Sequence, residues 1–173
     1  IKALGGFGVS AMMHGYLAFD KNDKQLAQFR TWRNTNARVA SEKLTEAFQF
    51  NIPERWSISH LYQCILDKEE HVKDVAFFTT LAGFIHWKLS GKKVLGIGDA
   101  AGMFPIDSQS GTYKKSYLKI FADLIKPYGF NWKLEDLLPE VLNAGDNAGF
   151  LTEEGAKLLD PSGELKPGCP LCP

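Results

Sequence analysis

The segment Val94–Asp107 constrains the fold of this chain more than any other, because it concentrates small residues between an apolar run and a proline. Its three glycines allow positive φ angles and let another segment or a ligand approach closely, and Pro105 fixes its own φ and lacks an amide donor. The pattern predicts a strand that ends in a tightly packed loop. The segment also carries two carboxylates eight positions apart, Asp99 and Asp107, which raise the question of acid/base or metal chemistry.

The composition indicates one globular domain without a charged surface for a polymer. The 173 residues are 45% hydrophobic and 23% charged, which is enough apolar content for a buried core. Twenty basic and twenty acidic residues give a net charge of zero, which argues against nucleic acid or an anionic membrane as a partner. No apolar run approaches the ~20 residues of a membrane span, and the chain does not open with a signal segment. We expect a cytoplasmic protein that binds a small neutral molecule, with a homodimer left open.

Periodicity predicts strands near the N-terminus and helices after them. Residues 1–9 are strand-like, and Tyr16–Asp20, the polar turn Lys21–Lys24 and Leu26–Trp32 predict an antiparallel hairpin. Two or three adjacent strands therefore open the domain. Apolar residues at helical spacing predict helices from about Asn34 to the residue before Pro53, over Ser59–Asp67, from Thr79 or Thr80 to Gly91, around Leu118–Ile125, over Leu134–Leu142 and from Thr152 onward.

Polar residues mark some of the boundaries between these elements. Asn34, Thr35 or Asn36 can accept an orphan amide at the start of the first helix. Val75–Phe78 predicts a buried strand, and Glu69–His71 is most simply a solvated loop.

The three cysteines do not form a convincing metal site. Cys169 and Cys172 are a lone Cys-Pro-Leu-Cys pair, and Cys64 lies among apolar residues. Zinc needs a second ligand pair, and nothing places this pair at a helix start as in a redox enzyme. We therefore expect no bound metal in this chain.

Three upstream segments set the glycine-rich segment in context: Gly8–Gly15, Trp32–Thr35 and Trp56–Leu61. In that order and at that spacing, they and Val94–Asp107 resemble the N-terminal domain of the FGGY carbohydrate kinases, which include xylulokinase, gluconokinase, ribulokinase and glycerol kinase. The resemblance runs from about Ile1 to the end of the chain. It implies an α/β fold of the ribonuclease H-like (actin-like ATPase) kind, with a mixed sheet and helices packed on its faces.

The resemblance also implies that Met13 and His14 hold sugar hydroxyls. Met12 stands where the family has an amide side chain, which removes one hydrogen-bonding group. His14 keeps the pattern, and its imidazole can both donate to and accept from a polyol. Without the family, a histidine beside methionines is more often a core residue, and we favour the sugar contact.

The two other upstream segments match the family incompletely. Trp32 and Asn34 fit a Trp-x-Asp/Asn-x-Arg segment that lines the sugar, but Asn36 occupies the arginine position. An ordinary core tryptophan followed by a helix-capping asparagine is an equally good interpretation. His60 and Gln63 stand where the family has lysine and tryptophan, which indicates a divergent member with a different acceptor.

The two carboxylates of the glycine-rich segment match a Ser-Asp-Ala-Ser-Gly…Asp stretch on the lobe that faces the cleft. This match implies a substrate-binding role for Asp99 and no catalytic role. In the family, the catalytic base lies in a later Gly-rich Asp motif, so we expect it downstream of Pro173. Asp146 lies in a lookalike of that motif and is expected to be a loop residue.

Residues 1–173 are therefore interpreted as a partial N-terminal kinase domain, with the first strands and phosphate loop upstream and the nucleotide-binding lobe downstream. The complete protein would use ATP and Mg²⁺ to phosphorylate a sugar or polyol hydroxyl, whereas this chain alone would fold but be inactive. The alternative is a non-catalytic sugar-binding or regulatory domain, which Met12, His60 and Gln63 favour. The sequence does not specify the sugar.

Overall fold

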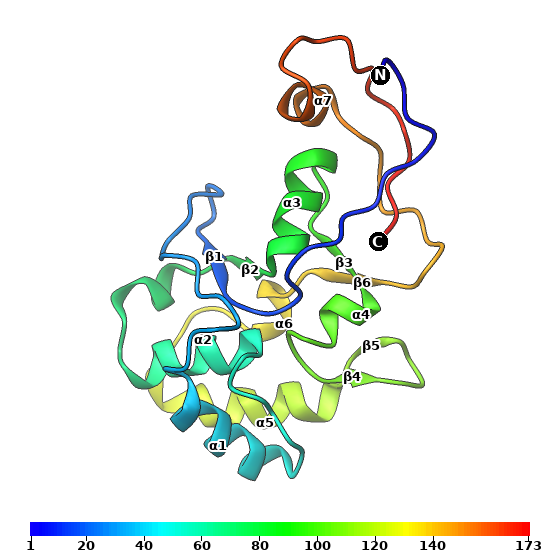
Figure 1. Cartoon of the computed structure of the whole chain (residues 1–173). Helices are drawn as coiled ribbons and strands as arrows, with labels where there is room; N and C mark the ends of the chain where they lie inside the picture. The colour runs from blue at the N-terminus through cyan, green and yellow to red at the C-terminus, as the bar shows by residue number, and fades with distance from the viewer.

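Short strands alternate with helices along residues 1–173, all of which the computed structural model describes (Figure 1). None of the helices combines the length and the apolar composition that crossing a bilayer requires. In chain order the elements are β1 (Leu17–Phe19), α1 (Arg38–Phe48), α2 (Ser57–Leu66), the 3₁₀ helix η1 (Glu70–Asp74), β2 (Phe77–Thr79), α3 (Leu81–Ser90), β3 (Val94–Gly96), α4 (Ile97–Ala100), β4 (Ile106–Asp107), β5 (Thr112–Tyr113), α5 (Lys115–Ile125), the 3₁₀ helix η2 (Lys126–Tyr128), α6 (Leu134–Leu137), β6 (Glu140–Leu142) and α7 (Glu153–Leu159).

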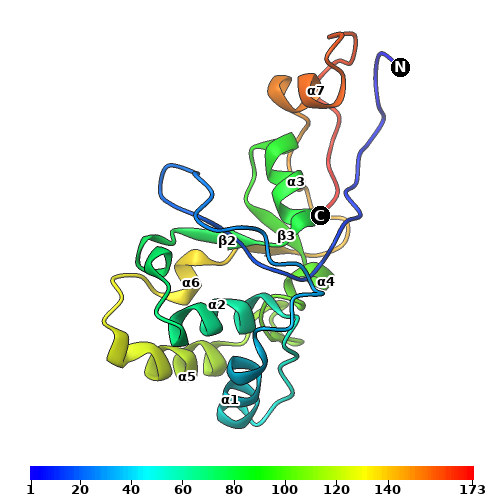
Figure 2. The ribbon, with the colours of Figure 1, turned by 60° about the vertical axis from the view of Figure 1, so that its left-hand side comes forward.

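The main hydrophobic core lies among α1, α2 and α5, which Figures 1 and 2 show from two directions. Leu44 of α1, Leu61 of α2 and Phe121 of α5 are fully buried in it. Phe78 of β2 and Phe104 after α4 join the same cluster. The helical faces predicted from apolar spacing for α1 and α5 therefore meet in one core.

Three two-stranded sheets provide the β structure: β1 and β2 are antiparallel, β3 and β6 are parallel, and β4 and β5 are antiparallel. The predicted hairpin is present, with bridges from Tyr16 to Arg30 and from Phe19 to Gln25. Its return segment forms isolated bridges and not a regular strand. The turn closes through Asp23, whose φ is 62°.

A second apolar cluster joins α3, α7 and the last residues of the chain. Leu89 of α3 packs with Ala156 of α7 and with Leu171. Residues 1–9 run beside this part of the molecule (Figure 1). They do not form a regular strand, because Phe7 makes a single parallel bridge to Leu171 and the remainder lacks a strand partner.

Helix capping follows the predictions at two sites and departs from them at a third. The hydroxyls of Thr80 and Thr152 accept the amide of the third residue of α3 and of α7, as expected for N-caps. The prediction for α1 was wrong, because its N-cap is Ala37, which has no capping side chain. The amide of Ala40 instead donates to Oε1 of Gln63, at 3.1 Å.

Two other segments differ from the sequence-based expectation. Leu134–Leu142 is not one helix, since α6 ends before Pro139 and β6 follows. The proline holds Leu138 in an extended conformation, with φ −82° and ψ 144°. Glu69–His71 is not a solvated loop: it leads into η1, and its side chains take part in a partly buried polar network.

Candidate functional site

The segment with Met13 and His14 packs directly on the glycine-rich segment after β3. A Cβ atom at Gly102 would lie 2.6 Å from Nδ1 of His14 and 2.9 Å from the carbonyl oxygen of Met13. Real Cβ atoms essentially never make contacts this short, so a larger residue fits here only if the His14 segment moves. The close approach predicted from the glycines is therefore confirmed, and it joins two segments far apart in the sequence.

The first turn of α2 holds both of these segments. The hydroxyl of Ser57 donates to the carbonyl oxygen of Gly15, directly after His14. The amide of Ser57 donates to the carbonyl of Gly102 at 3.4 Å, and the amide of Ile58 donates to that of Met103 at 3.1 Å. Amides at a helix start have no partner within the helix. Here they fix the glycine-rich segment against the His14 segment.

The imidazole of His14 is suited to hydrogen bonding with a neutral ligand. Burial lowers its pKa, the carbonyl of Gly102 opposes this shift, and the positive charge of Arg55 adds to it. The ring is therefore neutral at neutral pH, with one donor and one acceptor nitrogen. Its Nδ1 is buried without a hydrogen-bond partner in the protein.

Asp99 lies one turn before Gly102 and faces a cavity of about 190 Å³ between α3 and α4. Its Oδ2 accepts a hydrogen bond from the hydroxyl of Thr80 at 3.1 Å. Burial raises the pKa of Asp99, and the bond from Thr80 lowers it. His86 and Cys172 also line this cavity, whereas His14 does not. The structure thus brings Asp99 and His14 onto adjoining segments without pointing them into one pocket.

Trp32 and Asn34 follow the hairpin that begins at the His14 segment. The backbones of Tyr16 and Arg30 exchange two hydrogen bonds, of 2.8 and 3.3 Å, so the Trp32 segment leaves the hairpin beside the His14 segment. Trp32 is 48% exposed and has the guanidinium of Arg33 over its ring at 5.2 Å.

The exposure of Trp32 makes the core-tryptophan interpretation wrong. The helix-cap interpretation of Asn34 is also wrong. Oδ1 of Asn34 accepts the amide of Asn36 at 3.1 Å in a local turn, three residues before the N-cap of α1. The side-chain amide of Asn34 has no recorded partner in the protein and remains available as a donor.

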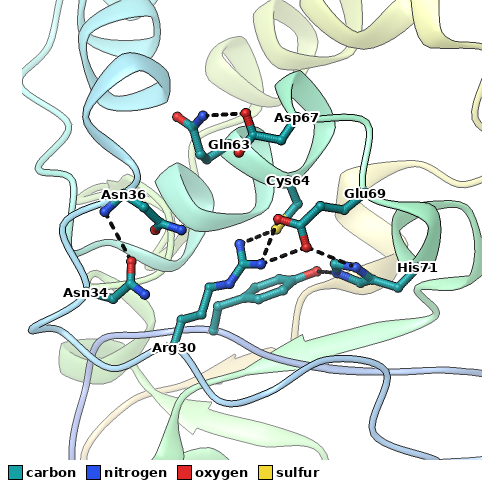
Figure 3. Close-up of polar contacts among 9 residues, drawn as sticks. Arg30, Asn34, Asn36, Gln63, Cys64, Asp67, Glu69 and His71 are labelled. Carbon is teal, nitrogen blue, oxygen red and sulfur yellow. Dashed lines mark hydrogen bonds and ion pairs between the residues drawn. The ribbon is translucent and has the colours of Figure 1, made fainter.

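A polar network beside this site had no counterpart in the sequence analysis (Figure 3). The guanidinium of Arg30 donates to both carboxylate oxygens of Glu69, each at 2.7 Å, and to Sγ of Cys64 at 2.8 Å. His71 lies 3.5 Å from the same carboxylate, and the hydroxyl of Tyr16 lies 3.2 Å from Nε2 of His71. The one available signal was the Glu-Glu-His run directly after a buried helix.

The network contains atoms of the kind that bind metals, but they are already engaged. The ligand atoms of Cys64, Glu69 and His71 lie within 4.8 Å of one another. The positively charged guanidinium of Arg30 already binds two of these groups, Cys64 and Glu69. Burial raises the pKa of Cys64 to about 12, so its thiol stays protonated. The expectation that Cys169 and Cys172 bind no metal stays a prediction.

The two α2 residues that depart from the family pattern are both internal. His60 is fully buried, neither ring nitrogen has a partner, and burial lowers its pKa to about 4. Gln63 caps α1 through Ala40 and donates to Oδ1 of Asp67 at 3.0 Å. Neither side chain is exposed to a ligand. Asp146 accepts the amide of Asn143 in an exposed loop, in line with the loop role expected for it.

Comparisons with known proteins give the chain its family. The sequence model of the FGGY family of carbohydrate kinases, N-terminal domain, matches residues 1–162. Among curated proteins, the xylulose kinase of Haemophilus influenzae is 24% identical in an alignment 167 residues long that covers 89% of this chain and 32% of that protein.

Solved structures agree with this match. The ligand-bound xylulose kinase of Lactobacillus acidophilus superimposes with a TM-score of 0.78 at 15% identity, over 98% of this chain and 34% of that one. The gluconate kinase of the same organism gives 0.74 at 16% identity, over 94% and 32%. The chain thus spans about a third of these relatives. The predicted ribonuclease H-like, actin-like α/β fold is confirmed, and the chain belongs to the FGGY family of carbohydrate kinases.

Proposed function

We propose that the complete protein transfers the γ-phosphoryl group of ATP to a hydroxyl of a sugar or polyol, and that this chain supplies the sugar-side wall of the cleft. The observation that carries the proposal is the match of residues 1–162 to the N-terminal domain of this kinase family. The geometry supports it, because a neutral imidazole, an exposed indole and a carboxylate lie on adjoining segments. Such groups recognise uncharged polyols through hydrogen bonds and stacking.

Each side chain has a distinct part in the proposed site. Nδ1 of His14 is buried, so the imidazole hydrogen-bonds one sugar hydroxyl through Nε2, while Met13, which is 37% exposed, offers an apolar surface to the carbon skeleton. Trp32 provides an aromatic wall, and the amide of Asn34 donates to a hydroxyl oxygen. The carboxylate oxygen of Asp99 that Thr80 leaves free accepts from a hydroxyl at the α3–α4 cavity.

The residues of this chain do not fit the nucleotide or its metal ion. No glycine-rich loop with a lysine opens a long helix, and Thr80 leaves Asp99, the one acidic side chain at the α3–α4 cavity, a single free oxygen. We therefore place the phosphate loop before Ile1, and the catalytic base and the ATP–Mg²⁺ lobe after Pro173. Phosphoryl transfer depends on positioning and electrostatics, so the reaction needs those parts together with this wall.

The test is a phosphotransfer assay of the full-length protein with ATP and Mg²⁺ against ketopentoses, hexuloses, polyols and aldonates. A thermal-shift screen runs in parallel, in which a sugar at 100 times its Kd stabilises by ~2.7 kcal/mol. Turnover of at least one acceptor is the expected result. A sugar that stabilises the protein without any turnover would refute the kinase function. It would support the alternative, a non-catalytic sugar-binding or regulatory protein.

That alternative has lost part of its support. Two of the three departures that favoured it, His60 and Gln63, are buried and serve packing and capping. Only Met12 remains, and its backbone carbonyl, not its side chain, makes the recorded contact, with the amide of Ala82 at 3.4 Å.

A further inference from the structure

The loop that carries Trp32 and Asn34, residues 31–36, is tied to α2 on both sides, and Figure 3 shows the tie made by Arg30. Directly before it, Arg30 reaches Cys64 of α2 and the carboxylate that follows the helix. Directly after it, the first turn of α1 is held by the bond from the Ala40 amide to Gln63 of α2. We call residues 31–36 the sugar-facing loop.

The sugar-facing loop has no comparable anchors of its own. Its recorded hydrogen bonds join residues two or three positions apart: the amides of Arg33 and Asn34 donate to Thr31, and the amide of Asn36 donates to Asn34. Such local turns shape a loop but do not fix it relative to the rest of the protein. None of its side chains is fully buried. The position of the sugar-facing loop therefore depends on the contacts that hold the residues directly before and after it.

Arg30 is well suited to fix the first end. Its guanidinium makes a bidentate contact with Glu69, and the two side chains are only 16% and 28% exposed. Bidentate charge-assisted bonds are strong and allow one orientation. Removing either partner leaves the other charge partly buried and uncompensated. The backbone of Arg30 also pairs with Tyr16, so the same residue relates the sugar-facing loop to the His14 segment.

The helix that receives these contacts also holds the opposite side of the site. Ser57, the first residue of α2, binds the carbonyl groups of Gly15 and Gly102, which flank His14. Gln63 and Cys64 lie about two turns further along the same helix. One rigid element therefore sets the distance between His14 and the sugar-facing loop.

We infer that Arg30 and Gln63 are positioning residues for the sugar acceptor: they hold Trp32 and Asn34 at a fixed distance from His14. The inference rests on the proposed function, because it assigns these groups to the sugar. The inference predicts an effect on the sugar and none on ATP. Loss of either anchor weakens the interaction with the sugar and leaves the interaction with ATP unchanged, since the proposed function assigns the nucleotide to the other lobe.

The test uses the full-length protein with the substitutions Arg30→Met and Gln63→Leu, and Arg30→Lys as the conservative variant. Lys93→Met is the matched control, because Lys93 forms an exposed ion pair of 2.6 Å with Asp23, and no hydrogen bond or ion pair joins either residue to α2. Each variant is measured below its Tm for the KM of the sugar, the KM of ATP, kcat, and hydrogen exchange of residues 31–36.

Arg30→Met and Gln63→Leu should raise the KM of the sugar about 10-fold or more and speed exchange in the sugar-facing loop, with the KM of ATP unchanged. Arg30→Lys should give a KM of the sugar and an exchange rate between those of the wild type and Arg30→Met, because an ammonium keeps the charge but not the bidentate contact. Unchanged hydrogen exchange of residues 31–36 in Arg30→Met and Gln63→Leu would overturn the inference. Equal increases in the KM of the sugar and the KM of ATP would also overturn it. A wild-type protein without turnover or sugar binding would refute the proposed function, and exchange would still decide whether the two anchors fix the loop.

Discussion

Replacing Gly102 by alanine should displace His14 and impair sugar phosphorylation without unfolding the protein. The new Cβ would lie 2.6 Å from Nδ1 of His14 and 2.9 Å from the carbonyl oxygen of Met13, whereas ordinary contacts begin at 3.4 Å. The His14 segment must therefore move by a large part of an ångström. Overpacking of this kind costs about 1–3 kcal/mol of stability. A misplacement of ~1 Å at a substrate contact can lower the rate ~10²-fold.

Gly98→Ala is the matched control for this substitution. Gly98 lies in α4, four residues before Gly102, needs no positive φ, and has no atom within 4 Å of an added Cβ. In the full-length protein, we expect Gly102→Ala to lower kcat/KM for the sugar by ~10- to 10²-fold and to leave the KM of ATP unchanged. Gly98→Ala should behave as wild type. Equal sugar kinetics for the two variants would refute the placement of His14 at the sugar.

Four further predictions test other parts of the molecule. His14→Ala should lower kcat/KM for the sugar ~10-fold or more, since it removes a hydrogen bond worth ~1 kcal/mol or more, whereas unchanged kinetics with a lower Tm would make it a core residue. Thr80→Val should lower the free energy of unfolding in urea by about 1–2 kcal/mol, because its hydroxyl caps α3 and donates to the cavity carboxylate, and Thr80→Ser should restore most of the loss. Burial lowers the pKa of His60 to about 4, so the unfolded state binds the proton more tightly. Stability should therefore be complete above pH 6.5 and fall by on the order of 2–3 kcal/mol as the pH drops toward 4, and His60→Leu should flatten this dependence in urea titrations. The isolated chain 1–173 should unfold cooperatively but phosphorylate no sugar. ATP-dependent activity of the purified chain would show that the catalytic base does not lie after Pro173.

The predictions that succeeded rest on interactions close in sequence. Thr80 and Thr152 cap helices through amides three residues away, and Gly91 ends α3 with a φ of 72°. Helical spacing identified the buried faces of α1 and α5 for the same reason, because a helix repeats within four residues. Such features are set by a short stretch of chain, so a single sequence is enough to find them.

The failures arose where a side chain binds a partner far along the chain. Arg30 is 34 residues from Cys64 and 39 from Glu69, and no local pattern links them. The missing cap of α1 has the same origin, since Gln63 of another helix supplies it. The exposure of Trp32 also could not be deduced from composition, because a tryptophan in a strand-like run is usually buried.

Two departures of this chain from the family pattern lie behind the proposed site. His60 and Gln63 replace a lysine and a tryptophan on α2, yet both are buried, while His14, Trp32 and Asn34 keep their places. The buried amide of Gln63 has its partner at the start of α1, the helix that follows the sugar-facing loop, whereas His60 has none. Under the proposed function, a change at Gln63 would therefore act on the sugar through the position of the loop and not through a new contact. On this basis, a different acceptor preference would come from the spacing between the two sides of the site, with the same chemical groups in place.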